Sequence, residues 1–403
     1  MSEPALRAEK LDAADELAAL RDRFVLDTEA DRGTDVAGVY LDGNSLGALP
    51  ANVPDRVADV VRRQWGELRI RSWDESGWWT APERIGDRIA PLVGAAPGQI
   101  VVGDSTSVNV FKALVAAVRM AGDSRDELLV DATTFPTDGY IAESAARLTG
   151  RTLRAVTPAE VPKALSERTA AVLLNHVDYR TGRLHDLPAL TAAIHARGAL
   201  AVWDLCHSAG ALPVGLDEHG VDLAVGCTYK YLNGGPGSPA YLYVRSALQD
   251  RFDSPLPGWN SHAEPFGMSP VYTAAPGALR GRVGTPDILS LLALEAALEV
   301  WDGVSIAAVR AKSLALTDFF LECVRAYTEP GRVECVTPER HEERGSQIAL
   351  RCPDAGEVMK RLIARGVVGD FRHPDVLRFG FTPLYVGFRD VERAARVLGD
   401  ELV

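Results

Sequence analysis

From about residue 97 onward, short apolar runs rich in β-branched residues alternate with longer stretches whose apolar positions recur at helical spacing. The short runs are QIVVG, ELLVD, AAVLLNHV, ALAVWD, DLAVG and AYLYV, and the helical stretches include VNVFKALVAAVRMAG, YIAESAARLTG and LPALTAAIHARG. Such alternation is typical of βαβ units. It predicts an α/β fold with a mainly parallel sheet covered by helices on both faces.

The C-terminal part of the chain follows a second pattern. Helices rich in Ala and Leu occupy residues 286–328, and after them short apolar runs and two helical stretches alternate in a smaller α+β arrangement. We expect a large domain over residues 51–290 and a small C-terminal domain over residues 291–403. The N-terminal segment, residues 1–50, is expected to pack with the small domain.

Composition limits the possible partners. The 403 residues are 47% hydrophobic, enough for a large core, and the net charge is −12. No block of basic residues is longer than Arg62–Arg63, which argues against nucleic-acid binding, and no run of about 18 apolar residues predicts a membrane span. The five cysteines lack metal-binding spacing, and the first twenty residues lack a continuous apolar stretch. These features indicate a reducing cytoplasm and a small-molecule partner.

A lysine and an aspartate follow two of the predicted strands. Asp204 ends the run ALAVWD, His207 comes three residues later, and Lys230 follows the run DLAVG, between two tyrosines. In open parallel sheets, ligands bind beyond the carboxyl ends of the strands. Pyridoxal phosphate requires this pair of groups, a carboxylate that keeps the pyridine nitrogen protonated and an amine that forms a Schiff base. The alternative is a capped turn with a solvated lysine, and the convergence of several polar groups favours the cofactor.

Two further loops fit the same cofactor. Residues 104–107 begin a predicted helix, where Thr106 and Ser107 could bind a phosphate with the free amides of the first turn. In FPTDGY, Phe135 could stack on the cofactor ring and Asp138 could bind beside it. By themselves these segments could equally be an ordinary helix cap and a proline-containing turn. No Gly-x-Gly-x-x-Gly or P-loop spacing follows a strand, which argues against a nucleotide-binding loop.

Taken together, the motifs resemble those of kynureninase, a fold-type-I pyridoxal phosphate enzyme of tryptophan catabolism. The resemblance covers nearly the whole chain, through LDGNSLG, TSVN, FPTD, HVDYRTGRLHD, WDLCHSAG, YKYLNGGPG, LPGW, GTPDIL and LRFGFTPLY. It implies an aspartate-aminotransferase-like fold with a seven-stranded, mainly parallel sheet and a homodimer that shares its active sites between subunits. The implied reaction is hydrolysis of the Cβ–Cγ bond of L-kynurenine, giving anthranilate and L-alanine without a metal.

The resemblance also implies a role for each matching residue. Lys230 would be the Schiff-base lysine and catalytic base, Tyr229 would relay a proton, and Asp204 would hold the ring nitrogen. Further cofactor contacts are implied for Thr106, Ser107, Phe135, Asp138, Asn175, His207, Tyr229, Trp259 and Thr285, the last two reaching the neighbouring subunit's site. Substrate contacts are implied for Asn44, Ser45, Trp73, His207 and Arg378. Arg378 would grip the α-carboxylate; if it is instead a surface arginine, Arg372 is the substitute.

Substrate preference and the rival activities also depend on individual residues. The position of Trp73 resembles one that is histidine in family members that prefer 3-hydroxykynurenine. The position of Thr285 resembles one that is asparagine in the same members. Because an indole and a short hydroxyl offer a ring hydroxyl fewer hydrogen bonds, we expect L-kynurenine to be preferred, unless the tryptophans only pack a core or interface. The rival activities are those of a class-V aminotransferase, a catalytically silent relative and a cysteine desulfurase. A desulfurase needs a nucleophilic thiol on a mobile loop, whereas Cys323, Cys335 and Cys352 lie in predicted helices and strands.

Overall fold

The large sheet of the computed structural model, which describes residues 2–26 and 38–402, has seven strands. Their spatial order is β4 (Ile100–Val102), β10 (Tyr241–Val244), β9 (Leu223–Gly226), β8 (Leu200–Asp204), β7 (Thr169–Asn175), β5 (Glu127–Asp131) and β6 (Thr152–Val156). β10 runs antiparallel to both its neighbours, and the other pairs are parallel. This confirms the mainly parallel sheet. The edge strand β6 was not foreseen, because its residues are half-buried or exposed and show no apolar run.

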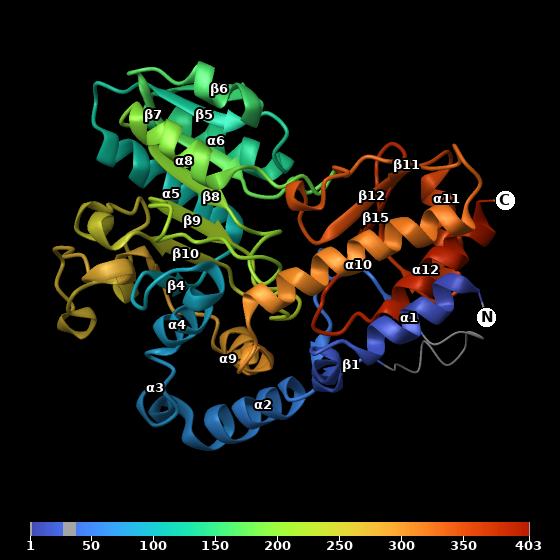
Figure 1. Ribbon diagram of the computed structural model, residues 1–403. Coiled ribbons are helices and arrows are strands. Elements are labelled where there is room, and N and C mark those ends of the chain that lie inside the picture. The colour runs from blue at the N-terminus through green and yellow to red at the C-terminus, as the bar shows by residue number, and fades with distance from the viewer. Residues whose placement is uncertain (1, 27–37, 403) are drawn as a thin grey trace.

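Helices cover the two faces of this sheet (Figure 1). They are α4 (Ala81–Val93), α5 (Thr106–Ala121), α6 (Pro136–Thr149), α7 (Val161–Ala164), α8 (Leu187–Ala196) and α9 (Ile288–Ala297). Successive residues of a strand point to opposite faces. Accordingly, Leu128 and Val130 join the core formed with α5 and α6, whereas Leu129 joins the core formed with α4, α8 and α9.

The carboxyl ends of the parallel strands form one edge of the sheet, and several polar residues stand there. β5 ends at Asp131, β7 at Asn175 and β8 at Asp204. Asn175 and Asp204 are directly opposite each other in the ladder. Since β4 also leads into α5 at this edge, the sheet places four loops around one site.

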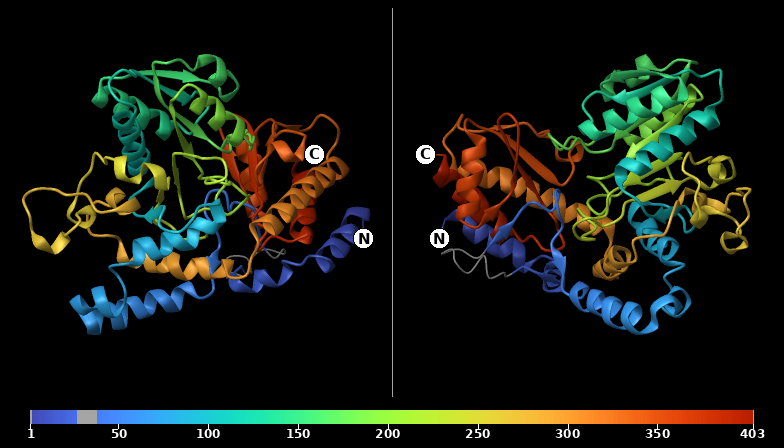
Figure 2. Two further views of the ribbon diagram at one scale, coloured as in Figure 1. Left: turned by 60° about the vertical axis from the view of Figure 1, so that its left-hand side comes forward. Right: turned by 180° about the vertical axis from the view of Figure 1, so that it is seen from behind.

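The smaller sheet is antiparallel and lies apart from the large one (Figure 2). Its order is β11 (Glu334–Cys335), β12 (Gln347–Arg351), β15 (Val376–Gly380) and β14 (Asp370–Arg372), and its helices are α10 (Ile306–Tyr327), α11 (Ala355–Ala364) and α12 (Phe388–Glu401). In the described parts of the chain, none of the helices combines the length and apolar character needed to cross a bilayer.

The N-terminal segment packs on this smaller sheet and its helices. α1 (Glu3–Ala13) contacts α12, and β2 (Val39–Tyr40) pairs in parallel with β13 (Val367–Val368). The strands β1 (Phe24–Val25) and β3 (Leu49–Pro50) pair with each other. Lys312 Nζ lies 2.7 Å from Asp15 Oδ2, and both side chains are less than a tenth exposed. The domain boundaries at residues 50 and 290 stay a prediction, and residues 27–37 lie outside the described residues.

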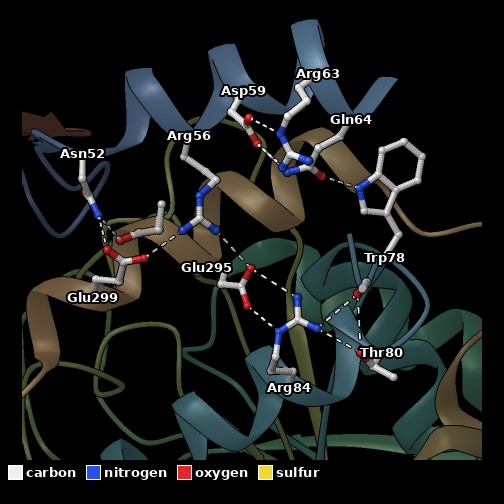
Figure 3. Close-up of polar contacts among 12 residues, drawn as sticks. Asn52, Arg56, Asp59, Arg63, Gln64, Trp78, Thr80, Arg84, Glu295 and Glu299 are labelled. Atoms are coloured by element: carbon white, nitrogen blue, oxygen red, sulfur yellow. Dashed lines mark hydrogen bonds and ion pairs between the residues drawn. The ribbon is translucent and has the colours of Figure 1, made fainter. Parts of the chain in front are cut away.

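A polar network fixes the segment between β3 and α4 onto α9 (Figure 3). The segment contains α2 (Val53–Asp59), a π-helical stretch (Val60–Leu68) and α3 (Ser72–Glu75). Glu295 of α9 pairs with Arg56 at 3.3 Å and with Arg84 at 2.5 Å. Gln64 accepts a hydrogen bond of 2.7 Å from the Trp78 indole. Arg84 also donates a hydrogen bond of 3.1 Å to the Gly77 carbonyl, so the tryptophan-bearing turn after α3 is held in place from two sides.

Candidate active site

A cavity of about 270 Å³ opens at the carboxyl edge of the large sheet, beside the small sheet. Every predicted site residue lines it except Trp73, Trp259 and Thr285. The predicted residues in its wall are Asn44, Ser45, Thr106, Ser107, Phe135, Asp138, Asn175, Asp204, His207, Tyr229, Lys230 and Arg378. Segments distant in the sequence thus meet at one cavity.

Lys230 lies in the loop after β9, where its amine contacts His207. Lys230 Nζ is 2.9 Å from His207 Nε2. Burial, with a smaller contribution from the Lys230 charge, lowers the pKa of His207 well below its usual range. The imidazole is therefore neutral, and its Nε2 accepts a hydrogen bond from the lysine amine.

Asp204 and Asp138 form a buried pair of carboxyl groups on the floor of the cavity. Asp204 Oδ1 accepts a 2.6 Å hydrogen bond from the amide of Cys206, and Asp138 Oδ2 accepts one of 3.1 Å from Thr134 Oγ1. Burial, followed by the nearby Asp204 carboxylate, raises the pKa of Asp138 well above its usual range. A buried pair of this kind favours a proton held between the two carboxyl groups.

The opposite end of the cavity is suited to an anion. Ser105 caps α5 by accepting a hydrogen bond from the Val108 amide, so the helix begins at Thr106 with its free amides and the hydroxyls of Thr106 and Ser107. The N-terminus of a helix of this length binds phosphate through those amides and the helix dipole. Lys112 lies further along α5 and is buried. Its Nζ is 2.7 Å from Asp104 Oδ2, and this ion pair fixes the loop before the helix.

These groups fit pyridoxal phosphate. The Lys230 amine, the carboxyl pair and the start of α5 match its aldehyde, ring nitrogen and phosphate. The ring of Phe135 is 46% exposed in the cavity wall and packs edge-on against Tyr179, with centroids 5.2 Å apart. Asn175 Oδ1 is buried without a hydrogen-bond partner among the described residues, which leaves an acceptor for a ligand.

The small sheet supplies the cationic wall of the cavity. Arg378 on β15 is 1% exposed, so it is not a surface arginine. It donates hydrogen bonds to Tyr179 O at 2.6 Å, to Ser45 Oγ at 2.9 Å and to Asp370 Oδ1 at 2.9 Å. Sequence analysis missed both Tyr179 and Asp370. Tyr179 lies within the HVDYRTGRLHD motif, which could have identified it, whereas Asp370 meets Arg378 only through the pairing of β14 with β15.

Trp73, Trp259 and Thr285 lie elsewhere in this chain. The Trp73 ring packs against Trp78, Trp79 and Trp259, with centroids 6.0, 6.2 and 6.3 Å apart. Thr285 is exposed and lines a separate cavity of about 60 Å³ beside Lys112. Within one chain, these three residues do not reach the cavity around Lys230.

Comparisons with known proteins identify the relatives of this chain. Residues 309–398 match the family model described as the kynureninase C-terminal domain. Among solved structures, a cysteine desulfurase from Escherichia coli matches with a TM-score of 0.81 at 19% identity, covering 96% of this chain and 98% of that one. A lysine-to-alanine variant of the cystine C-S lyase C-DES, with glycine linked to its PLP cofactor, matches with a TM-score of 0.79 at 16% identity, covering 93% and 99% of the two chains. These likenesses confirm the fold.

The most informative similarities are with curated relatives. The kynureninase of Deinococcus radiodurans is 50% identical over 390 residues, which are 95% of this chain and 93% of the relative. The kynureninase of Pseudomonas fluorescens is 46% identical over 398 residues, or 97% and 94% of the two chains. Because about half of the residues are identical across nearly the full length of both proteins, this chain belongs to the kynureninase family.

Proposed function

We propose that this protein hydrolyses L-kynurenine to anthranilate and L-alanine with pyridoxal phosphate bound in the cavity around Lys230. The observation that carries the proposal is family membership at 46–50% identity, joined to a cavity that holds Lys230, Asp204 and Arg378 together. Structural similarity to a cysteine desulfurase and to a cystine C-S lyase, at under 20% identity, extends only to the fold.

The residues that would hold the cofactor come from the large sheet and its loops. Lys230 would bind it covalently, Asp204 and Asp138 would hold its ring nitrogen, and Thr106 and Ser107 would hold its phosphate. Phe135 would cover one face of the ring, with Asn175 and His207 at its edge. When bound there, pyridoxal phosphate supplies an electron-poor ring that withdraws electrons from the α-carbon of the substrate.

Lys230 is the base in this proposal, and His207 orients it. The Lys230 amine takes the proton from the substrate α-carbon, because it is the lysine nitrogen in the cavity wall. The buried, neutral imidazole of His207 is 2.9 Å away and fixes the direction of the amine by accepting its hydrogen bond. Since burial opposes a charge on His207, this residue does not compete for the proton.

Tyr229 is the proton donor for the later steps. Electrostatic repulsion from the neighbouring Cys227 sulfur, and then burial, raise the pKa of the Tyr229 phenol above its usual range. The phenol therefore keeps its proton at neutral pH and can donate it when the Cβ–Cγ bond breaks. Its loop is held by a 2.8 Å hydrogen bond from the Gly47 amide to the Tyr229 carbonyl.

The direct test is incubation of the cofactor-loaded protein with L-kynurenine, following anthranilate and alanine together. Equal amounts of both products are expected. Parallel reactions with a keto acid and with cysteine test for amino-group transfer and sulfide release. Transfer or sulfide without anthranilate would refute the proposal in favour of an aminotransferase or a desulfurase.

The proposal includes a homodimer with shared sites, and it is supported by the positions of Trp259 and Thr285 outside the cavity of their own chain. Several large apolar side chains near the tryptophan cluster are exposed: Trp65 at 61%, Ile70 at 76%, Phe266 at 71% and Met268 at 81%. An apolar surface of this kind supports a subunit interface. Analytical ultracentrifugation at working concentration tests it, and a fully active monomer would contradict it.

The preference for L-kynurenine over 3-hydroxykynurenine depends on this dimer. In it, Trp73 and Thr285 of one subunit would approach the aromatic end of the substrate bound to the other. Replacing Thr285 by asparagine should raise kcat/KM for the hydroxylated substrate relative to kynurenine. A wild-type preference for 3-hydroxykynurenine would overturn this assignment.

We also place the protein in the cytoplasm, in tryptophan catabolism or the supply of NAD precursors. All five cysteines are free thiols, which supports a reducing compartment. Cell fractionation with an antibody to the protein tests the location.

A further inference from the structure

Two cysteines stand next to each other at the carboxyl edge of the large sheet. Asp204 of β8 is opposite Val225 of β9, and the ladder continues with a hydrogen bond of 2.8 Å from the Leu205 amide to the Val225 carbonyl. Cys206 and Cys227 are the residues two places beyond that pair, so they occupy neighbouring positions on the two segments. Adjacent strands lie about 4.8 Å apart, and a disulfide joins Cα atoms about 4.4–6.8 Å apart. The spacing of the two segments therefore suits a disulfide bond.

The sulfur atom of each cysteine lies against the backbone of the other. Cys206 Sγ accepts a hydrogen bond of 3.2 Å from the Cys227 amide, and Cys227 Sγ is 3.8 Å from the Cys206 carbonyl oxygen. Burial raises the pKa of the Cys227 thiol, but its hydrogen bond with Cys206 and the Lys230 charge outweigh burial and lower that pKa. The pair thus favours a thiolate beside a thiol, the arrangement from which disulfides form.

The cavity gives a small oxidant access to this pair. Cys206 lines the cavity around Lys230, and its Sγ lies 3.8 Å from Thr106 Oγ1 at the start of α5. Cys227 is not part of the described cavity wall, so an oxidant that enters meets Cys206 first. The remaining cysteines lie in α10, in β11 and directly after β12: Cys323, Cys335 and Cys352.

We propose that Cys206 and Cys227 form a site of reversible oxidation, at which hydrogen peroxide converts the two thiols into a disulfide bond and thereby stops catalysis. In the first step, a thiolate of the pair attacks one peroxide oxygen and the O–O bond breaks, which gives a sulfenic acid and water. The second sulfur then attacks the first, so the S–S bond forms and a second water leaves. Two electrons pass from the sulfur atoms to the peroxide, which also takes up the protons of both thiols.

The disulfide acts on catalysis through the two segments that it joins. Cys227 comes three residues before Lys230, and the Cys206 amide donates a hydrogen bond of 2.6 Å to Asp204 Oδ1. A disulfide bond is about 2.05 Å long, shorter than any contact between unbonded sulfur atoms, so its formation must shift these segments. A displacement of about 1 Å at a catalytic group can lower the rate about 100-fold. The oxidised enzyme should therefore lose turnover.

The test detects the disulfide directly by mass. Residues 198–230 contain neither Lys nor Arg before Lys230, so one tryptic peptide carries both thiols. The cofactor-loaded enzyme is treated with hydrogen peroxide, denatured, alkylated with iodoacetamide and digested. The peptide should have lost two hydrogen atoms and carry no alkyl group, and turnover of L-kynurenine should fall by about tenfold or more. Dithiothreitol should restore both alkylation sites and the rate.

Three variants separate this pair from other sites of oxidation. Cys206→Ala and Cys227→Ala each keep a single thiol that cannot form the bond, so peroxide should lower their rates less than about threefold, each relative to its own untreated rate. Cys352→Ala, which removes a buried thiol after β12, is the matched control and should respond as wild type does.

Three results would overturn the inference: two alkylated thiols in the peptide from treated wild type, an equal loss of rate in wild type and Cys206→Ala, or a cross-linked enzyme with its full rate. Absence of kynurenine turnover in the untreated enzyme would refute the proposed function instead, and the mass of the peptide would still decide whether the disulfide forms.

Discussion

Replacing Gly47 by alanine tests whether the NSLG loop controls the position of the catalytic lysine. A Cβ atom at Gly47 would lie 2.8 Å from Asn233 Cα, and closer still to the Lys230 carbonyl oxygen and Asn233 Oδ1. Ordinary van der Waals contact begins at 3.4 Å. The Lys230 oxygen and Asn233 Cα belong to the backbone of the lysine loop and cannot rotate away. The NSLG loop and the lysine loop must therefore separate by roughly 1 Å.

A displacement of that size at the base should lower kcat by about 100-fold. Overpacking should also lower the free energy of unfolding by about 1–3 kcal/mol. The rate is measured by anthranilate release, and stability by urea denaturation. The control is Gly139→Ala in α6, where the new Cβ meets nothing within 4 Å and the helix should gain about 0.5–1 kcal/mol. If Gly47→Ala kept a kcat within threefold of the control, the argument for contact with the lysine loop would be wrong.

Three other predictions follow from single contacts. Lys230→Ala should abolish both turnover and the visible absorbance of the bound cofactor while the circular dichroism stays unchanged; a persistent absorbance band with normal turnover would contradict the assignment. Lys312→Met should lower the free energy of unfolding, measured by urea denaturation, by about 3–5 kcal/mol, because it leaves the Asp15 carboxylate buried and unpaired. Adding Asp15→Asn should restore most of that free energy. A loss below about 1 kcal/mol in Lys312→Met would be evidence against the buried pair. Burial, and then Asp370, raise the pKa of Asp42 to about 6, above its value in the unfolded chain. Between about pH 4 and 6 the folded state therefore binds more protons than the unfolded state. The free energy of unfolding should fall by about 2–3 kcal/mol as the pH rises across this range. Asp42→Asn should lack this fall, and parallel stability curves for the two proteins would disprove the cause.

The strands of the large sheet were predictable because their signal is local. Buried parallel strands read as continuous apolar runs, and ELLVD, AAVLLN and ALAVWD coincide with β5, β7 and β8. β6 escaped because an edge strand with exposed residues carries no such run. The pairing of β2 with β13 also escaped, since short strands distant in the sequence carry no information about their partners.

The site was predictable to the extent that its motifs lie next to strand ends. Asp204 and Lys230 follow β8 and β9, so topology alone brings them to one edge. The role of Asp370 was not accessible, because it depends on the antiparallel register that sets it opposite Arg378. Within one chain the Trp73 ring lies in a tryptophan cluster, so its contact with the substrate stays a prediction that depends on the dimer.

The cavity is closed by the first and last parts of the chain, and this has a consequence for folding. Ser45 and Arg378, which meet in its wall, are 333 residues apart in the sequence, whereas the large sheet is complete by Val244. Closing so long a loop is slow, and during synthesis the Ser45 hydroxyl emerges early but gains Asp370 and Arg378 only when β14 and β15 leave the ribosome. The large sheet can therefore form around Lys230 before any carboxylate site exists. In refolding experiments, attachment of the cofactor should recover before substrate binding does.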